Sequence, residues 1–221
     1  MDRVVRRLAY RSPSDGTGRA PLRCQKSCDT YAARAASAMI GDMFADMFMN
    51  PAADPRVDPP SQADERTTLV SFLRWQRHTL ELKCADLDAE QLSRRALEFS
   101  SLSLLGLLRH MADVERVWFK RRLGQQDVPP CFRTDADPDA AFNGAVADPG
   151  IVSEAWGAWR AEVAFAEQFV AEAPDLDIVG PDVRRGAVSL RWVLVHMIEE
   201  YARHNGHADL LRQCIDGRVG Q

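Results

Sequence analysis

The segment SLRWVLVHMIEEYARHNGHADLLR, residues 189–212, combines a helical apolar pattern with a row of side chains of the kind that bind metals. Its apolar residues recur every three or four positions, which is typical of the buried face of a helix. Ser189 is a suitable N-cap and Gly217 a suitable C-terminal stop. We therefore predict one long helix from Ser189 to Gly217, with an apolar face that other helices must cover.

Three other segments show the same spacing of apolar residues. The first runs from about residue 64 to 87, and the second from a cap at Ser100–Ser103 to about Leu123. The third follows Asp148-Pro-Gly, with Ser153 as its expected cap, and stops at Pro174. No segment has a convincing strand pattern.

The connections between these helices differ in length. The connection between the second and third helix, residues 124–150, is long and rich in Pro, Asp and Gly, whereas the first connection is short. Four helices with one long connection indicate an all-α protein, a four-helix bundle with one long crossover connection. We place this bundle at residues 51–217.

Residues 1–50 have a different character. They are rich in Arg, contain Pro and Gly breakers and show no sustained apolar period. We predict a disordered or misassigned N-terminal extension. Cys24 and Cys28 lie in this stretch without companion ligands, so we expect no metal site there.

The composition excludes several classes of function. A chain of 221 residues with 46% hydrophobic and 27% charged residues is long enough for one globular domain. The net charge of −4 gives no reason to expect nucleic acid as a partner, and no apolar run reaches the roughly 18–20 residues of a membrane helix. Five scattered cysteines favour the reducing cytoplasm. We expect small-molecule substrates, and leave open a homodimer formed through helix faces.

Four potential ligands lie on one face of the last predicted helix. At about 100° per residue, His196, Glu200, His204 and His207 fall within an arc of about 80°. The neighbouring core position Tyr201 turns part of this arc toward the bundle interior. Burying an unpaired carboxylate costs several kcal/mol, so Glu200 needs a cation or good hydrogen bonds.

His110 is the third candidate ligand. It is in phase with the apolar residues Leu107 and Val114, and Gly106 leaves room beside it. A lone inward histidine is more often a hydrogen-bonded core residue, but the histidine-rich stripe favours a metal site made by His110, Glu200 and His204. Two imidazoles and one carboxylate leave a coordination position open, which is typical of catalytic zinc.

The neighbouring polar residues leave alternatives open. For His196 we favour a packed or hydrogen-bonded role over that of a fourth ligand. His207 either lines the mouth of a cofactor pocket or lies on the surface. Asp113 and Glu115 flank His110, and each either accepts its N–H or faces solvent. The five tryptophans are expected to fill the core rather than to line a cofactor site.

The chain resembles the DinB/YfiT-like superfamily of metal-binding four-helix bundles. It is most similar to the branch of mini-circle proteins, related to mycothiol-dependent S-transferases and maleylpyruvate isomerase. The matching stretches are residues 64–77, 103–119 and 189–212. Many members carry His-x-x-x-His on the fourth helix, whereas this chain has Glu200 at the first of these positions, as the maleylpyruvate isomerase-like members do.

The resemblance implies a function. It maps His110, Glu200 and His204 onto the family's ligand set, with zinc or nickel as the divalent metal and a low-molecular-weight thiol, mycothiol for an Arg-rich sequence, as co-substrate. We expect a metal-dependent thiol S-transferase that detoxifies electrophilic small molecules, with a metal-activated thiolate as nucleophile. The alternatives are a thiol-dependent isomerase on the same site and a non-catalytic, metal-stabilised bundle that binds a partner.

Overall fold

A computed structural model describes residue 54 and residues 56–219, so the predicted extension at residues 1–50, with Cys24 and Cys28, lies outside the described residues. In chain order the elements are the helices α2 (Glu65–Cys84), α3 (Ala89–Ser93) and α4 (Leu104–Glu115), the π-helix η2 (Arg116–Leu123), helices α5 (Ala140–Asn143) and α6 (Pro149–Glu172), strands β1 (Val179–Asp182) and β2 (Gly186–Ser189), and helix α7 (Leu190–Asp216).

The four long helices begin at side-chain caps. Asp64 accepts from the backbone N–H of Thr67 at the start of α2, and Ser103 and Ser189 cap α4 and α7 in the same way. Gly217 ends α7 in the left-handed conformation (φ 80°), as predicted. The expected cap of α6 was wrong, because Asp148 caps this helix and Pro149 occupies its first turn.

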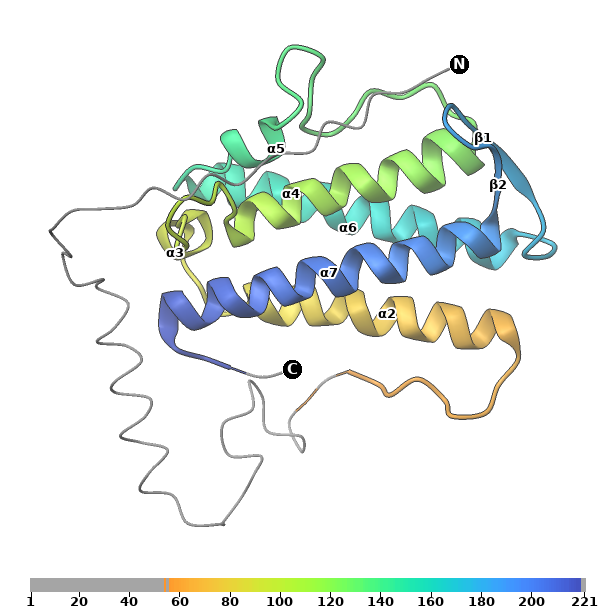
Figure 1. Ribbon diagram of the computed structural model, residues 1–221, viewed down its shortest axis with the longest axis horizontal. Coiled ribbons are helices and arrows are strands. Elements are labelled where there is room, and N and C mark those ends of the chain that lie inside the picture. Colours follow the sequence, from red (N-terminus) through yellow and green to blue (C-terminus); the bar gives the residue numbers. More distant parts are fainter. Residues whose placement is uncertain (1–53, 55, 220–221) are drawn as a thin grey trace, which may run out of the picture. The chain divides into compact units, whose positions relative to one another are not determined.

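The bundle has the predicted crossover. Helix α2 packs along α7 and helix α4 packs along α6. Figure 1 shows α4 and α6 running in the same direction, so residues 124–148 must return along the length of the bundle before α6 begins. The predicted all-α class and four-helix bundle are therefore confirmed. Among the described residues, no helix combines the length and apolarity needed to cross a membrane.

Smaller elements depart from the sequence prediction. Helix α2 ends at Cys84, three residues early, and the first connection is longer than expected and contains α3. An antiparallel hairpin of β1 and β2, with Gly180 opposite Val188, precedes α7, although no strand was predicted. Gly180 packs against the backbone of Arg122, where a Cβ atom would lie 2.3 Å from the carbonyl oxygen. The hairpin thus packs closely on η2. Its strands are only four residues long, which is too short for an apolar period to predict them.

A buried carboxylate connects all four long helices. Glu115 at the end of α4 is fully buried and accepts two hydrogen bonds from Arg77 of α2, both 2.7 Å long. The hydroxyl of Tyr201 on α7 donates to Glu115 over 2.7 Å, and Nε1 of Trp159 on α6 donates to Tyr201 over 2.9 Å. Burial acts to lower the pKa of Arg77, but the charge of Glu115 outweighs it and raises this pKa. We call these four residues the Glu115 hub.

The outcome for Glu115 corrects the sequence prediction, in which this carboxylate accepted from His110 or faced solvent. It does neither, because the hub satisfies both of its oxygens inside the core. The hub lies within the apolar core, in which Leu73, Leu108 and Met197 are at most 2% exposed, and the Arg77 guanidinium lies over the Phe119 ring. A bidentate guanidinium–carboxylate pair in such surroundings is a strong and directional contact.

Replacing Arg77 by methionine should destabilise the fold by roughly 3–5 kcal/mol, because it leaves Glu115 charged and buried without its cation. Urea unfolding followed by circular dichroism measures this loss. The matched control is Arg74→Met, which removes a pair with Glu167 whose side chains are 53% and 40% exposed. This control should cost about 1 kcal/mol or less. Equal, small losses in both variants would contradict the role of the hub.

Candidate metal centre

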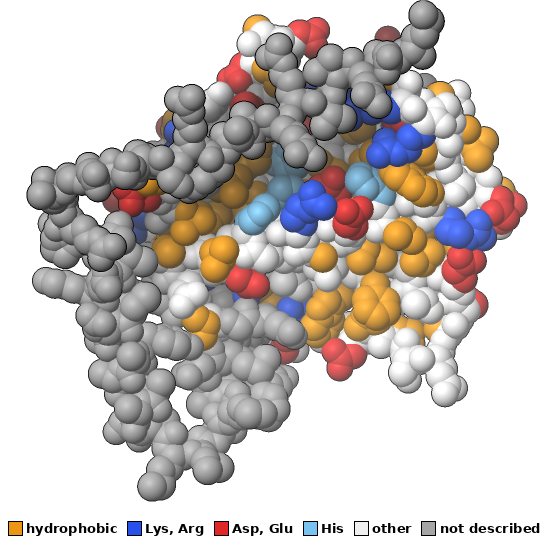
Figure 2. Space-filling view, in the orientation of Figure 1, with side chains coloured by type: hydrophobic (Ala, Val, Ile, Leu, Met, Phe, Trp, Pro, Cys, Tyr) orange, Lys and Arg blue, Asp and Glu red, His pale blue; other side chains and the backbone are white. Residues whose placement is uncertain are grey.

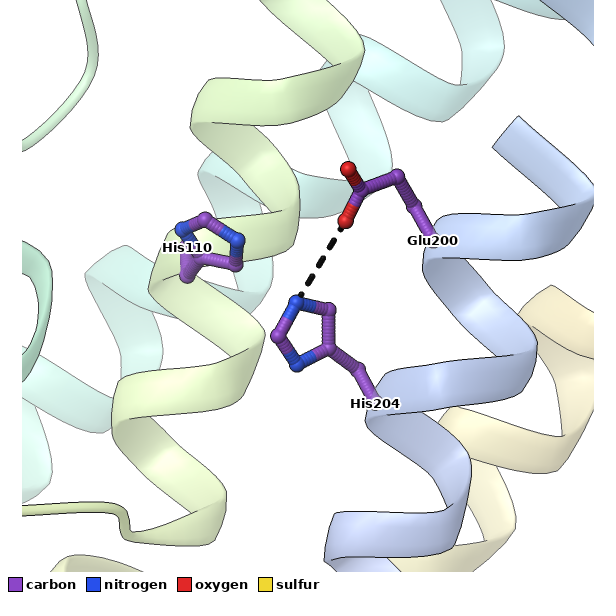
Figure 3. A group of neighbouring side chains, drawn as sticks. All are labelled: His110, Glu200 and His204. Carbon is purple, nitrogen blue, oxygen red and sulfur yellow. Dashed lines mark ion pairs between the residues drawn. The ribbon is translucent and has the colours of Figure 1, made fainter. Parts of the chain in front are cut away.

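The structure brings His110, Glu200 and His204 together. His110 comes from α4, while Glu200 and His204 stand one turn apart on α7. One ligand atom of each lies within 4.8 Å of the other two, and Nε2 of His204 is 3.5 Å from Oε2 of Glu200. Figure 3 shows the three side chains pointing toward one another across the seam between the helices.

The seam is open to solvent on one face. All three side chains are half-buried rather than enclosed. In Figure 2 histidine side chains reach the surface over the seam between α4 and α7, with acidic and basic side chains beside them. A small ligand can therefore approach this cluster from outside the bundle.

The electrostatics of the two histidines suit metal ligands. Burial lowers the pKa of His110, against the opposing charges of Glu200 and Asp113. Burial lowers the pKa of His204 to about 4, and the nearby imidazoles and Arg203 act in the same direction. Both imidazoles are therefore neutral at pH 7, which is the form that donates a nitrogen lone pair.

The donor set also matches the needs of a divalent cation. Ligands bound to zinc at about 2.1 Å stand about 3.4 Å apart in a tetrahedron, so small side-chain rotations from the observed spacing would close the set. Two nitrogens and one carboxylate oxygen suit zinc or nickel better than magnesium or calcium, which prefer oxygen ligands.

His196 and His207 contact the ligand set without belonging to it. His196 packs between Trp118 and Trp192, with ring centroids 4.8 and 4.9 Å away, and its Nε2 lies 3.5 Å from Oε1 of Glu200. This arrangement agrees with the favoured packed role. Nδ1 of His207 lies 3.3 Å from Nδ1 of His204. A proton on Nδ1 of His204, donated to His207, leaves the Nε2 lone pair free.

A pocket of about 260 Å³ opens beside His110. His207 is not among its lining residues, so its predicted place at a pocket mouth stays a prediction. Trp159 belongs to the buried core, and Trp118, Trp156 and Trp192 pack against it, as expected for most of the tryptophans. Trp118 also lines the pocket. Within the described chain, the pocket walls come from α4, η2 and the long connection.

Phe142 of the long connection fills the space beside His110 that Gly106 was expected to leave. A Cβ atom on Gly106 would lie 2.7 Å from the Phe142 ring, so only glycine admits this ring. Phe142 stacks on His110 with centroids 5.5 Å apart. The contact restricts rotation of the His110 ring, which also meets the His204 ring edge-on at 4.8 Å.

Asp113 holds the long connection in place and does not accept from His110. Its buried carboxylate accepts from the backbone N–H groups of Cys131, Phe132 and Arg133. Both roles considered for Asp113 were therefore wrong, because three backbone donors of the connection reach it first. The sequence offered one signal, an acidic residue inside a strongly apolar helix.

Two of the described thiols, Cys84 and Cys131, are poor nucleophiles. Burial raises the pKa of Cys84 to about 12, and that of Cys131 to about 12 as well. Both are therefore protonated at neutral pH. Cys214 is exposed on α7 and belongs to neither the triad nor the pocket beside it.

Comparisons with known proteins agree with this architecture. The crystal structure of a conserved protein from Enterococcus faecalis is similar, with a TM-score of 0.50 and 16% sequence identity. The similarity covers 71% of this chain and 99% of that one, and at this identity it shows the fold alone. No curated protein matches the sequence significantly. Residues 68–217 match the mycothiol-S-transferase family, a span that contains most of α2, all of α4, α6 and α7, and the triad. The chain therefore belongs to the mycothiol-S-transferase family.

Proposed function

We propose that this protein transfers a low-molecular-weight thiol, mycothiol, to an electrophilic small molecule in a metal-dependent reaction. The observation that carries the proposal is the convergence of His110, Glu200 and His204, with ligand atoms within 4.8 Å of one another. Membership of the mycothiol-S-transferase family supports the thiol and the reaction class.

A divalent cation held by these three donors would have an open coordination position and would favour the thiolate form of a bound thiol at neutral pH. The protein residues prepare this site. His110 and His204 are neutral donors because burial lowers their pKa, and Glu200 contributes the negative charge that offsets a dication. His207 and His196 hold the orientation of His204 and Glu200.

The remaining chemistry depends on holding two small molecules close together. The pocket beside His110 has apolar walls, including Val114 and Val117, against which an electrophile can pack. Holding the two reactants aligned in one site makes their reaction effectively unimolecular, which raises its rate. Neither Cys84 nor Cys131 is needed as a covalent nucleophile.

Purified protein should bind close to one zinc ion per chain, measured by plasma mass spectrometry after dialysis against Zn²⁺. His110→Ala should retain far less, because it removes one of three ligands. The matched control is His78→Ala, since His78 lies on α2 and outside the triad. Stoichiometric zinc in His110→Ala would overturn the ligand assignment.

His207→Ala should lower zinc affinity by about 10–100-fold without abolishing binding, because it removes the group that orients His204. Competition with a chromogenic chelator measures this change. Gln213→Ala, an exposed position on the same helix, is the control and should keep the wild-type affinity. An unchanged affinity in His207→Ala would show that this histidine has no orienting role.

Mixing zinc-loaded protein with mycothiol and 1-chloro-2,4-dinitrobenzene should consume one thiol per adduct formed, followed by adduct absorbance and a total-thiol assay. His204→Ala should lower kcat/KM by about 100-fold or more, because a ligand is lost. If an isomerisable electrophile is converted to its isomer while the total thiol stays constant, the protein is instead an isomerase. Stoichiometric metal without turnover of any thiol would favour a non-catalytic bundle.

A further inference from the structure

The pocket beside His110 has a chemical character of its own. Its apolar walls include Val117, Trp118 and Phe142, and its charged groups other than His110 and the buried Asp113 are Arg133 and Asp139. A volume of about 260 Å³ lies just below the roughly 300–1,000 Å³ of typical ligand pockets, so its occupant must be compact. A flat apolar body with a charged end suits such walls.

Arg133 is held beside the triad by the helix that carries His110. The Asp113 carboxylate, 4% exposed and three residues after His110, accepts from the backbone N–H of Arg133 at 3.0 Å. Arg109 fixes the other side of the connection through hydrogen bonds to the carbonyl oxygens of Ala140 and Gly144. The backbone that presents Arg133 and Asp139 to the pocket is thus anchored at both ends to α4.

The two charged side chains are available to a ligand. Within the part of the chain that the structure describes, the Arg133 guanidinium has no hydrogen bond or ion pair, since its only hydrogen bond comes from its backbone. The Asp139 carboxylate does not cap the helix that follows it, α5. Both residues are exposed. A guanidinium in this position can bind a carboxylate with two parallel hydrogen bonds.

We propose that this pocket binds the electrophilic substrate and that Arg133 selects compact molecules carrying one carboxylate, while Asp139 disfavours a second negative charge. The identification of the ligand as the electrophilic substrate rests on the proposed function, whereas the binding of a carboxylate in this pocket does not. Arg133 acts here as a specificity-determining residue. The apolar walls receive the body of the ligand and place it next to His110.

Three probes of similar shape test this selection. Benzoate has one negative charge, benzamide has none and terephthalate has two. Dissociation constants are measured by NMR titration of the full-length protein, both zinc-loaded and after EDTA treatment. The variants are Arg133→Gln and Asp139→Asn, which exchange exposed charges for neutral groups of similar size.

Benzoate should bind wild type about fivefold more tightly than benzamide, with or without zinc, because the exposed ion pair contributes modestly. Arg133→Gln should erase this preference, and Asp139→Asn should keep it while improving terephthalate binding. Persistence of the preference in Arg133→Gln overturns the proposal, as does absence of saturable benzoate binding up to about 10 mM. A preference that disappears with EDTA in wild type assigns the carboxylate to the metal and also overturns it.

The metal-dependent reaction and the anion-selective pocket can fail independently of each other. If the protein holds no zinc but Arg133 still determines the benzoate preference, the metal-dependent reaction fails and the anion-selective pocket stands. If zinc binds and thiol is transferred but Arg133→Gln changes nothing, the reaction stands and the pocket proposal fails.

Discussion

The structure depends on the buried contact between Glu115 and its three partners. A carboxylate with no exposure to solvent is stable only when its charge is matched and its lone pairs are satisfied, and Arg77 and Tyr201 meet both needs. Because the partners come from different helices, the contact also sets the register of α2, α6 and α7 against α4. An apolar core alone permits several registers of four helices. The hub favours one of them.

The candidate metal centre lies on the helices that the hub connects. Tyr201 directly follows Glu200 on α7, and Glu115 stands five residues after His110 on α4. A shift of α7 along α4 would therefore break the hub and separate the triad at the same time. The buried contact costs desolvation and contributes little net stability compared with a well-packed apolar core. Its main effect is on geometry, because it aligns α4, which carries His110, with α7, which carries Glu200 and His204.

Much of this arrangement can be predicted from the sequence. The four helices follow from apolar spacing and caps, and Glu200 and His204 share a helix face by their four-residue separation alone. The meeting of His110 with that pair depends on bundle register, which periodicity does not fix. The pairing of Arg77 with Glu115 is not evident from the sequence, although each interrupts an apolar stripe with an opposite charge. Arg133, Phe142 and the hairpin lie in segments without any period, so their placement follows from tertiary contacts only.

We propose that the register set by the hub brings two imidazoles and one carboxylate together as a single metal site. X-ray absorption at the zinc edge tests it most directly, on zinc-loaded wild-type protein without added thiol. Scattering from two imidazole rings with oxygen or nitrogen neighbours at about 2.0–2.2 Å is the result expected from His110, His204 and Glu200. A sulfur neighbour at about 2.3 Å, or scattering from fewer than two imidazoles, would contradict it.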